Sequence, residues 1–183
     1  MENVVVVYKS RTGFTDGYAH WIAEELGCEI YPLENVNLVN FSPFDMVIFG
    51  GGVRAGKIDG IHFIKKALKS CPEKQLVVFA TGAAPQEDTE AAKRVQQGNI
   101  PANVEIPFFY FQSGINYERM KGVDKLIMSV VRMIMRGMKE KEGSDQMVQA
   151  MKNSYDYSSR GDIEPLISYV RNWEDSSLLI ADR

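Results

Sequence analysis

Short apolar runs alternate with longer amphipathic stretches along the first two thirds of the chain. Residues 4–8 form a continuous apolar run, which is typical of a strand that is covered on both faces. Residues 15–26 then carry apolar side chains at helical spacing, and Gly27 is a helix stop signal. By the same criteria, the pattern predicts strands at residues 28–33, 46–49, 76–80 and 108–111 and helices at residues 61–68 and 89–95.

The order of these elements indicates the fold class. Strands that alternate with helices of this length favour an α/β fold with a doubly wound, five-stranded parallel sheet, because right-handed connections then place helices on both faces. A chain of 183 residues with 45% hydrophobic residues is long enough and apolar enough to bury the core that such a sheet needs.

The last third of the chain departs from this alternation. Its pattern predicts a helix at residues 123–139, a polar loop at 141–162 and a last helix at 163–173. We therefore expect a single domain over residues 1–174, a helical insertion at about 115–160 before the last helix, and a flexible tail at 175–183.

Charge and cysteine content narrow the functional classes. The net charge of -3 creates no long-range field for nucleic acid, so no nucleic-acid partner is expected. Cys28 and Cys71 match no metal or redox spacing, so we expect reduced thiols and no metal site. No signal sequence precedes the first strand, and no apolar stretch reaches the ~18 residues of a membrane span. These features favour a cytoplasmic protein.

The loop after the first predicted strand carries the strongest chemical signal. Its sequence is Ser10-Arg11-Thr12-Gly13-Phe14-Thr15. Gly13 lets the backbone turn its N–H groups inward, three hydroxyls can donate, and the following helix N-terminus supplies partial positive charge. A plain helix cap would need only one of these hydroxyls. The pattern therefore predicts a phosphate site, with Arg11 adding a cation at its rim.

Residues 4–15 resemble the first strand and phosphate loop of flavodoxins, which have the form S/T-x-T-G-x-T. The resemblance implies an FMN cofactor at the switch point of a sheet with strand order 2-1-3-4-5. It also implies that the loop holds the FMN phosphate without an arginine or a metal ion to neutralise it.

Two further loops are expected at the same edge of the sheet, because ligands of doubly wound folds lie beyond the carboxyl ends of the strands. By resemblance, residues 50–57 and 81–85 match the two flavin-ring loops of flavodoxins. The cofactor-binding residues expected from them are Gly51, Gly52, Val53, Arg54, Thr81, Gly82 and Ala83. A glycine peptide within residues 50–52 is expected to rotate when the flavin is reduced, because glycine tolerates positive φ.

Two other classes of site are excluded by single positions. Residues 51–57 spell G-x-x-x-x-G-K, but Ile58 stands where a nucleotide-binding P-loop needs a hydroxyl for Mg²⁺. A receiver domain needs carboxylates after its first strand, where this chain has Lys9 and Ser10. His20 and His62 are isolated, so no catalytic residue is assigned.

The segment 123–141 carries apolar residues at helical spacing together with basic side chains. It can be a core-packed helix with a solvated face, or a helix that meets a membrane surface, a hydrophobic substrate or a partner. Together with residues 51–57 and Tyr117-Glu118-Arg119, it resembles the flavodoxin-type protoporphyrinogen dehydrogenases, which pass electrons from a tetrapyrrole precursor to quinone.

These features lead to one main functional hypothesis and two alternatives. The main hypothesis is an FMN-dependent oxidoreductase with its own substrate, since neither flavin-ring loop offers the Trp or Tyr that carriers usually place against the ring. The first alternative is a one-electron carrier between redox proteins. The second is a flavodoxin-like scaffold that has lost its flavin.

Overall fold

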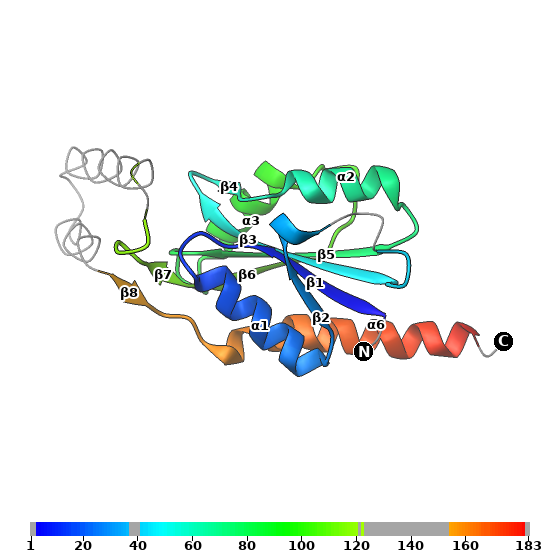
Figure 1. Ribbon diagram of the computed structural model, residues 1–183. Helices are drawn as coiled ribbons and strands as arrows, with labels where there is room; N and C mark the ends of the chain where they lie inside the picture. Colours follow the sequence, from blue (N-terminus) through cyan, green and yellow to red (C-terminus); the bar gives the residue numbers. More distant parts are fainter. Residues whose placement is uncertain (1–2, 37–40, 121, 123–153, 182–183) are drawn as a thin grey trace.

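A computed structural model describes residues 3–36, 41–120, 122 and 154–181 (Figure 1). The strands are β1 (Val4–Lys9), β2 (Glu29–Pro32), β3 (Met46–Arg54), β4 (Lys57–Ile58), β5 (Gln75–Gly82), β6 (Phe108–Gln112), β7 (Gly114–Ile115) and β8 (Tyr155–Asp156). The α-helices are α1 (Phe14–Leu26), α2 (His62–Ser70), α3 (Thr89–Asn99) and α6 (Glu164–Ala181). Short 3₁₀ turns lie at η1 (Leu33–Asn35) and η3 (Arg160–Ile163).

The main sheet confirms the predicted fold class and strand order. Its hydrogen-bonded path is β2-β1-β3-β5-β6, and all neighbours on this path are parallel. Because β4 is a short antiparallel partner at the end of β3, this path is the expected order 2-1-3-4-5 of the five principal strands. The switch point lies between β1 and β3, where the chain crosses from one half of the sheet to the other.

Side chains alternate between two hydrophobic cores, one on each face of the sheet. Val4 and Val6 of β1 pack with α1 and α6, whereas Val5 and Val7 pack on the face that carries α2 and α3. Figure 1 shows these two helical layers on opposite sides of the strands. All four valines are at most 1% exposed, which explains why the strand reads as an unbroken apolar run.

The glycine run 50–52 corrects one sequence-based expectation. It was expected in a loop, but β3 continues through it to Arg54 and pairs in register with β1 and β5. A Cβ on Gly50 would lie 2.0 Å from the Phe79 ring, and a Cβ on Gly51 would lie 2.5 Å from the Asp59 carbonyl oxygen. These glycines therefore serve close packing within the sheet. The peptide rotation at residues 50–52 on flavin reduction stays a prediction, and it would have to break ladder hydrogen bonds of β3.

The C-terminal helix is longer than predicted. The expected helix at residues 163–173 is observed as α6, which reaches Ala181 and so includes most of the segment expected as a tail. Tyr18 joins α1 to the segment before α6: its hydroxyl lies 2.8 Å from Asp162 Oδ2 and accepts a hydrogen bond from the Ser159 N–H. Burial raises the pKa of the Tyr18 hydroxyl above its ordinary value.

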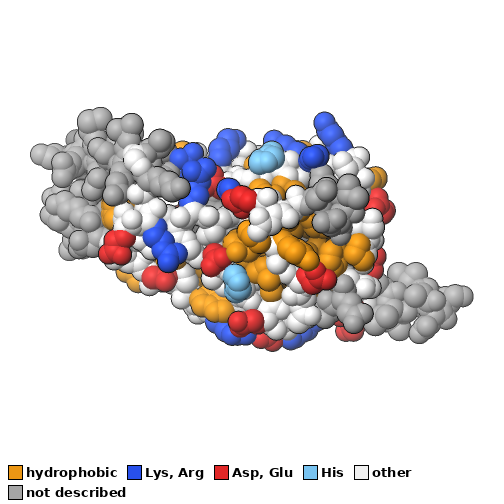
Figure 2. All heavy atoms as spheres, viewed as in Figure 1, with side chains coloured by type: hydrophobic (Ala, Val, Ile, Leu, Met, Phe, Trp, Pro, Cys, Tyr) orange, Lys and Arg blue, Asp and Glu red, His pale blue; other side chains and the backbone are white. Residues whose placement is uncertain are grey.

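The helix expected at residues 123–139, and with it most of the predicted insertion, lies outside the described residues. Within the described ranges, no helix combines the length and apolar composition that crossing a bilayer requires. On the face shown in Figure 2, acidic and basic side chains are interspersed with exposed apolar ones.

Candidate functional site

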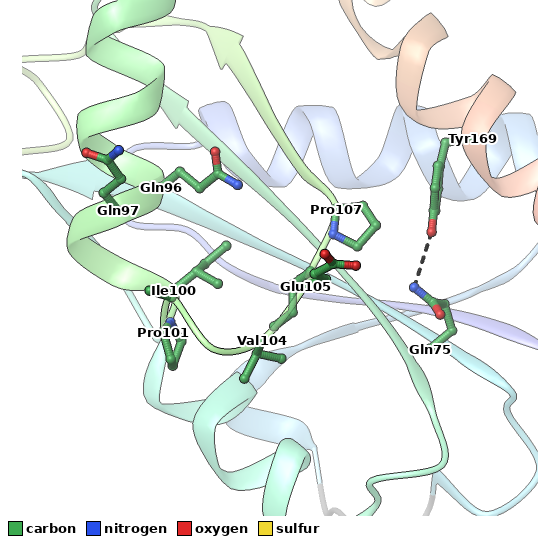
Figure 3. Close-up of a pocket in the computed structure, with 11 residues that line it drawn as sticks. Gln75, Gln96, Gln97, Ile100, Pro101, Val104, Glu105, Pro107 and Tyr169 are labelled. Carbon is green, nitrogen blue, oxygen red and sulfur yellow. Dashed lines mark hydrogen bonds between the residues drawn. The ribbon is translucent and has the colours of Figure 1, made fainter.

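The larger of two notable cavities lies at the amino ends of β5 and β6. It measures about 700 Å³ and is walled by the C-terminal end of α3, the loop to β6 and Tyr169 of α6 (Figure 3). Its polar groups are mostly amides, and Gln75 donates a 3.2 Å hydrogen bond across it to the Tyr169 hydroxyl. Ligands of doubly wound sheets bind at the opposite edge, and no anion-binding loop faces this cavity, so it is not the candidate site.

A second cavity, of about 280 Å³, lies at the carboxyl ends of the strands. It collects residues from four separate loops and strand ends. Its lining residues are Arg11, Thr12, Phe14, Thr15, Gly52, Val53, Arg54, Ala55, Asp59, Thr81, Gly82, Ala83, Ser113, Gly114, Ile115 and Met120. Most of the predicted cofactor-binding residues are among them, whereas Ser10, Gly13 and Gly51 are not.

The first loop is built to accept an anion at the start of α1. Gly13 has a φ of 101°, in the left-handed region that favours glycine, and α1 has no side-chain cap among the described residues. The Ser10 hydroxyl accepts a 3.2 Å hydrogen bond from the Gly13 N–H, so it shapes the loop. The first N–H groups of an uncapped helix need an external acceptor, and a phosphate is a suitable one.

Two threonine hydroxyls meet beneath this loop. Thr15 Oγ1 and Thr81 Oγ1 lie 2.8 Å apart, and the two residues are only 2% and 3% exposed. Each hydroxyl carries one proton, and their shared bond uses one of the two. The other proton can be donated toward the cavity. A Cβ on Gly52 would lie 3.4 Å from Thr15 Oγ1, so glycine at position 52 keeps the space beside the hydroxyl pair open.

The second loop is a tight hairpin between β3 and β4. Ala55 and Gly56 form its turn, with φ angles of 47° and 77°, which suits a two-residue hairpin. The side chain of Asn99, which is 5% exposed, accepts from the Ile58 N–H at 3.0 Å and donates to the Gly56 carbonyl at 2.8 Å. This turn, and not the glycine run, is where the backbone has positive φ beside the cavity.

The β3–β4 hairpin argues against the P-loop alternative. A P-loop needs its lysine to face the phosphates, but Lys57 Nζ donates a 2.7 Å hydrogen bond to the Gly98 carbonyl oxygen on α3. Residues 51–54 lie in a strand, so they cannot form the phosphate-cradling nest that the G-x-x-x-x-G-K pattern implies.

The third loop follows β5 and is supported by β6. Thr81 and Gly82 are the last residues of the strand, and Ala83 begins the loop. The Tyr110 hydroxyl accepts from the Ala84 N–H at 3.0 Å and lies 3.3 Å from the Ala84 carbonyl oxygen. Burial raises the pKa of Tyr110 to about 12, so the hydroxyl stays protonated and keeps donating across the neutral range.

Several lining residues were missed by the sequence analysis. Asp59 was missed because the sequence pattern did not reveal the β3–β4 hairpin that precedes it. Its carboxylate forms an ion pair with Arg11, with Nε at 2.6 Å from Oδ2. Ser113, Gly114 and Ile115 follow β6, whose carboxyl end also reaches the cavity. Loops that follow parallel strands gather at the carboxyl edge of the sheet, and the loop after the fifth predicted strand obeys the same rule. Residues 113–115 could therefore have been predicted as part of the site from the sequence.

The wall of the cavity is mainly small and apolar. Among the described residues that line it, Phe14 is the one aromatic side chain, and Val53, Ala83, Ile115 and Met120 provide most of the remaining apolar surface. Within the described ranges, no three His, Cys, Asp or Glu side chains are placed to hold a metal ion. The arrangement suits an organic ligand with one anionic end and a flat apolar body.

Comparison with protein-family models matches residues 5–145 to the flavodoxin domain family. A search of the curated proteins gave no match. Among solved structures, the chain is similar to a flavodoxin from the domain Archaea, with 12% identity over 73% of this chain and 99% of that one and a TM-score of 0.40. It is also similar to two-electron reduced Megasphaera elsdenii flavodoxin, with 15% identity over 58% and 82% of the two chains and a TM-score of 0.40.

The comparison also includes a larger protein, rubredoxin oxygen:oxidoreductase from Desulfovibrio gigas. It shares 15% identity with this chain over 81% of this chain and 36% of its own length, with a TM-score of 0.40. Because these TM-scores lie below 0.5, no conclusion about this chain rests on the solved structures.

Proposed function

The chain belongs to the flavodoxin domain family, whose cofactor is FMN, and on that premise we propose that the cavity at the carboxyl ends holds FMN for an oxidoreductase reaction. The observation that carries the proposal is the meeting of an uncapped helix N-terminus, a buried hydroxyl pair and an apolar wall in one cavity. Bound FMN would supply electron transfer, and the protein would orient it and set its potential.

The residues present fit FMN. The phosphate would lie against Thr12 and the first N–H groups of α1, where the helix dipole favours negative charge. The flat ring system would lie along the walls formed by the β3–β4 hairpin and the loop after β5. Gly52 leaves the floor beside the Thr15–Thr81 pair open, as a close-fitting ligand requires. Among the described residues that line the cavity, one phosphate-binding loop is present, which favours FMN over FAD.

Release of the cofactor by heat tests the proposal. We expect the purified protein to be yellow and to release FMN, in a ratio near one per chain, that mass spectrometry distinguishes from FAD and riboflavin. A colourless protein that takes up no added FMN would contradict the proposal and favour the flavin-free scaffold.

We further propose that the protein acts on its own organic substrate. Small side chains such as Val53, Ala55 and Ala83 line the cavity where a carrier would place an aromatic cover, so a bound ring would stay uncovered by aromatic side chains there. Protoporphyrinogen with a quinone acceptor is the candidate pair that the resemblance in residues 51–57 and 117–119 suggests. The basic helix proposed for substrate or peripheral membrane contact, residues 123–141, lies outside the described residues.

Arg54 gives this substrate proposal a specific test. It lines the cavity, and a guanidinium can pair bidentately with a propionate carboxylate of a tetrapyrrole. We expect Arg54→Gln to raise the KM for protoporphyrinogen roughly 10-fold, the size of one lost charge-assisted hydrogen bond. The KM is measured on protein saturated with FMN, because Arg54 also lines the flavin cavity. The exposed Arg94 of α3 provides a control, because Arg94→Gln removes the same charge outside the cavity lining. Equal KM values for the two variants would contradict the role of Arg54.

The one-electron carrier is the alternative, and it predicts the opposite behaviour. A carrier would exchange electrons rapidly with a ferredoxin-type reductase and be inert toward tetrapyrroles and quinones. That result with FMN-loaded protein would replace the enzyme proposal, while leaving the FMN site intact.

A further inference from the structure

The segment after β7 folds back over the first loop. Asn116 Nδ2 donates a 3.4 Å hydrogen bond to the Thr12 carbonyl oxygen, and Asn116 Oδ1 accepts from the Arg119 N–H at 3.1 Å. One side chain therefore fixes both the loop and the turn that carries Arg119, although the two lie more than a hundred residues apart in sequence.

This contact brings a guanidinium against the loop. A Cβ built on Gly13 would lie 2.7 Å from Arg119 Nη1, so the guanidinium lies directly over the backbone of the residue that begins α1. Arg119 is exposed and, within the described residues, makes no ion pair. An exposed cation that lies over an uncapped helix N-terminus is an arrangement that attracts an anion.

The charges around the loop show why a further cation is needed there. The charge of Arg11 is offset by Asp59, whose carboxylate lies 2.6 Å away. Asp16 adds a negative charge in the first turn of α1, with its carboxylate 3.7 Å from the His20 ring. A phosphate monoester carries a charge of about -1.5 to -2 at neutral pH. Arg54 lines the same cavity, on the β3–β4 hairpin. At the start of α1 itself, Arg119 adds a cation that no carboxylate among the ion pairs of the described residues offsets.

We infer that Arg119 binds the phosphate of the flavin cofactor, as a cation supplied from outside the phosphate loop and positioned by Asn116. The inference rests on the proposed function, and it differs from the expectation that the loop holds its phosphate without an arginine. Arg119 thereby distinguishes FMN from riboflavin, which has the same ring system and no phosphate. The segment after β7 also becomes part of the cofactor site.

The test compares the affinities of the apoprotein for FMN and riboflavin, measured by quenching of flavin fluorescence. We expect Arg119→Gln to weaken FMN binding roughly 10- to 100-fold, because a charge-assisted hydrogen bond is lost, and to change riboflavin binding less than about twofold. Arg119→Lys keeps the positive charge but not the planar guanidinium, so its FMN affinity should fall less than that of Arg119→Gln. Asn116→Ala should weaken FMN binding in the same direction by releasing the turn.

Ionic strength separates a charge contact from a structural support. FMN affinity of the wild type should fall as salt rises, and Arg119→Gln should flatten that dependence, because a partly exposed ion contact is screened. Arg171→Gln is the control, because Arg171 pairs with Glu25 at the far end of α1. Unchanged FMN affinity in Arg119→Gln, an equal loss for riboflavin, or an unaltered salt dependence would each overturn the inference. A wild type that binds neither flavin would overturn the proposed function itself.

Discussion

FMN affinity should fall by roughly 100-fold or more when Thr12 and Thr15 are both replaced by alanine, since each hydroxyl bond to a charged acceptor contributes about 1.5–3 kcal/mol. Both residues line the cavity, and Thr15 also shares its buried bond with Thr81. Titration of the apoprotein with FMN, followed by flavin fluorescence, measures the loss.

Thr89→Ala is the matched control for this pair. Thr89 is exposed at the start of α3 and does not line the cavity, so its replacement should leave FMN affinity unchanged. The Thr15→Ala change should also lower stability by about 1–3 kcal/mol, because it leaves the Thr81 hydroxyl without its buried partner. An unchanged FMN affinity in the double variant would mean that the phosphate binds elsewhere.

Gly50→Ala should be strongly destabilising, with a loss of about 3 kcal/mol or more in the free energy of unfolding. The added Cβ would lie 2.0 Å from Phe79 Cζ and within 2.6 Å of two further atoms of that ring. Phe79 is fully buried in the core beneath α1 and α6, so the ring has no space into which it can withdraw. Urea unfolding of the apoprotein measures the change without a contribution from bound ligand.

Gly17→Ala is the opposite case and serves as the control. Gly17 lies within α1, and a Cβ there meets nothing within 4 Å. Because glycine is costly in a helix interior, this substitution should stabilise the protein by about 0.5–1 kcal/mol. If Gly50→Ala were as well tolerated as Gly17→Ala, the claim that β3 packs tightly against Phe79 would be contradicted.

The periodicity of the sequence was sufficient to predict the sheet, because burial on both faces leaves a continuous apolar run in β1 and in the first half of β3. The same periodicity did not predict the second half of β3, because glycine normally indicates a turn, whereas the glycines at residues 50–52 allow close packing within the sheet. The distinction depends on Phe79, a residue on another strand, and no local pattern contains it. The end of α6 was misjudged because the last residues of a chain were expected to fray, whereas the helix continues to Ala181.

The candidate site was predictable where its residues follow strands directly. Thr12, Thr15 and Thr81 could be named because each lies at the carboxyl end of a predicted parallel strand or in the loop that follows it. Asp59 and Arg119 could not, since one depends on the hairpin between β3 and β4 and the other on a contact made through Asn116. Contacts between segments distant in sequence have no local signature.

The central claim is that FMN binds at the carboxyl ends of the strands. Titrating the isotope-labelled apoprotein with FMN, while following its backbone amide resonances, tests this claim most directly. The account predicts one-to-one binding that shifts the amides of residues 11–15, 52–55, 81–83 and 113–115 and leaves those of the larger cavity, residues 96–106, unchanged. Shifts confined to residues 96–106, or no shifts at all, would contradict it.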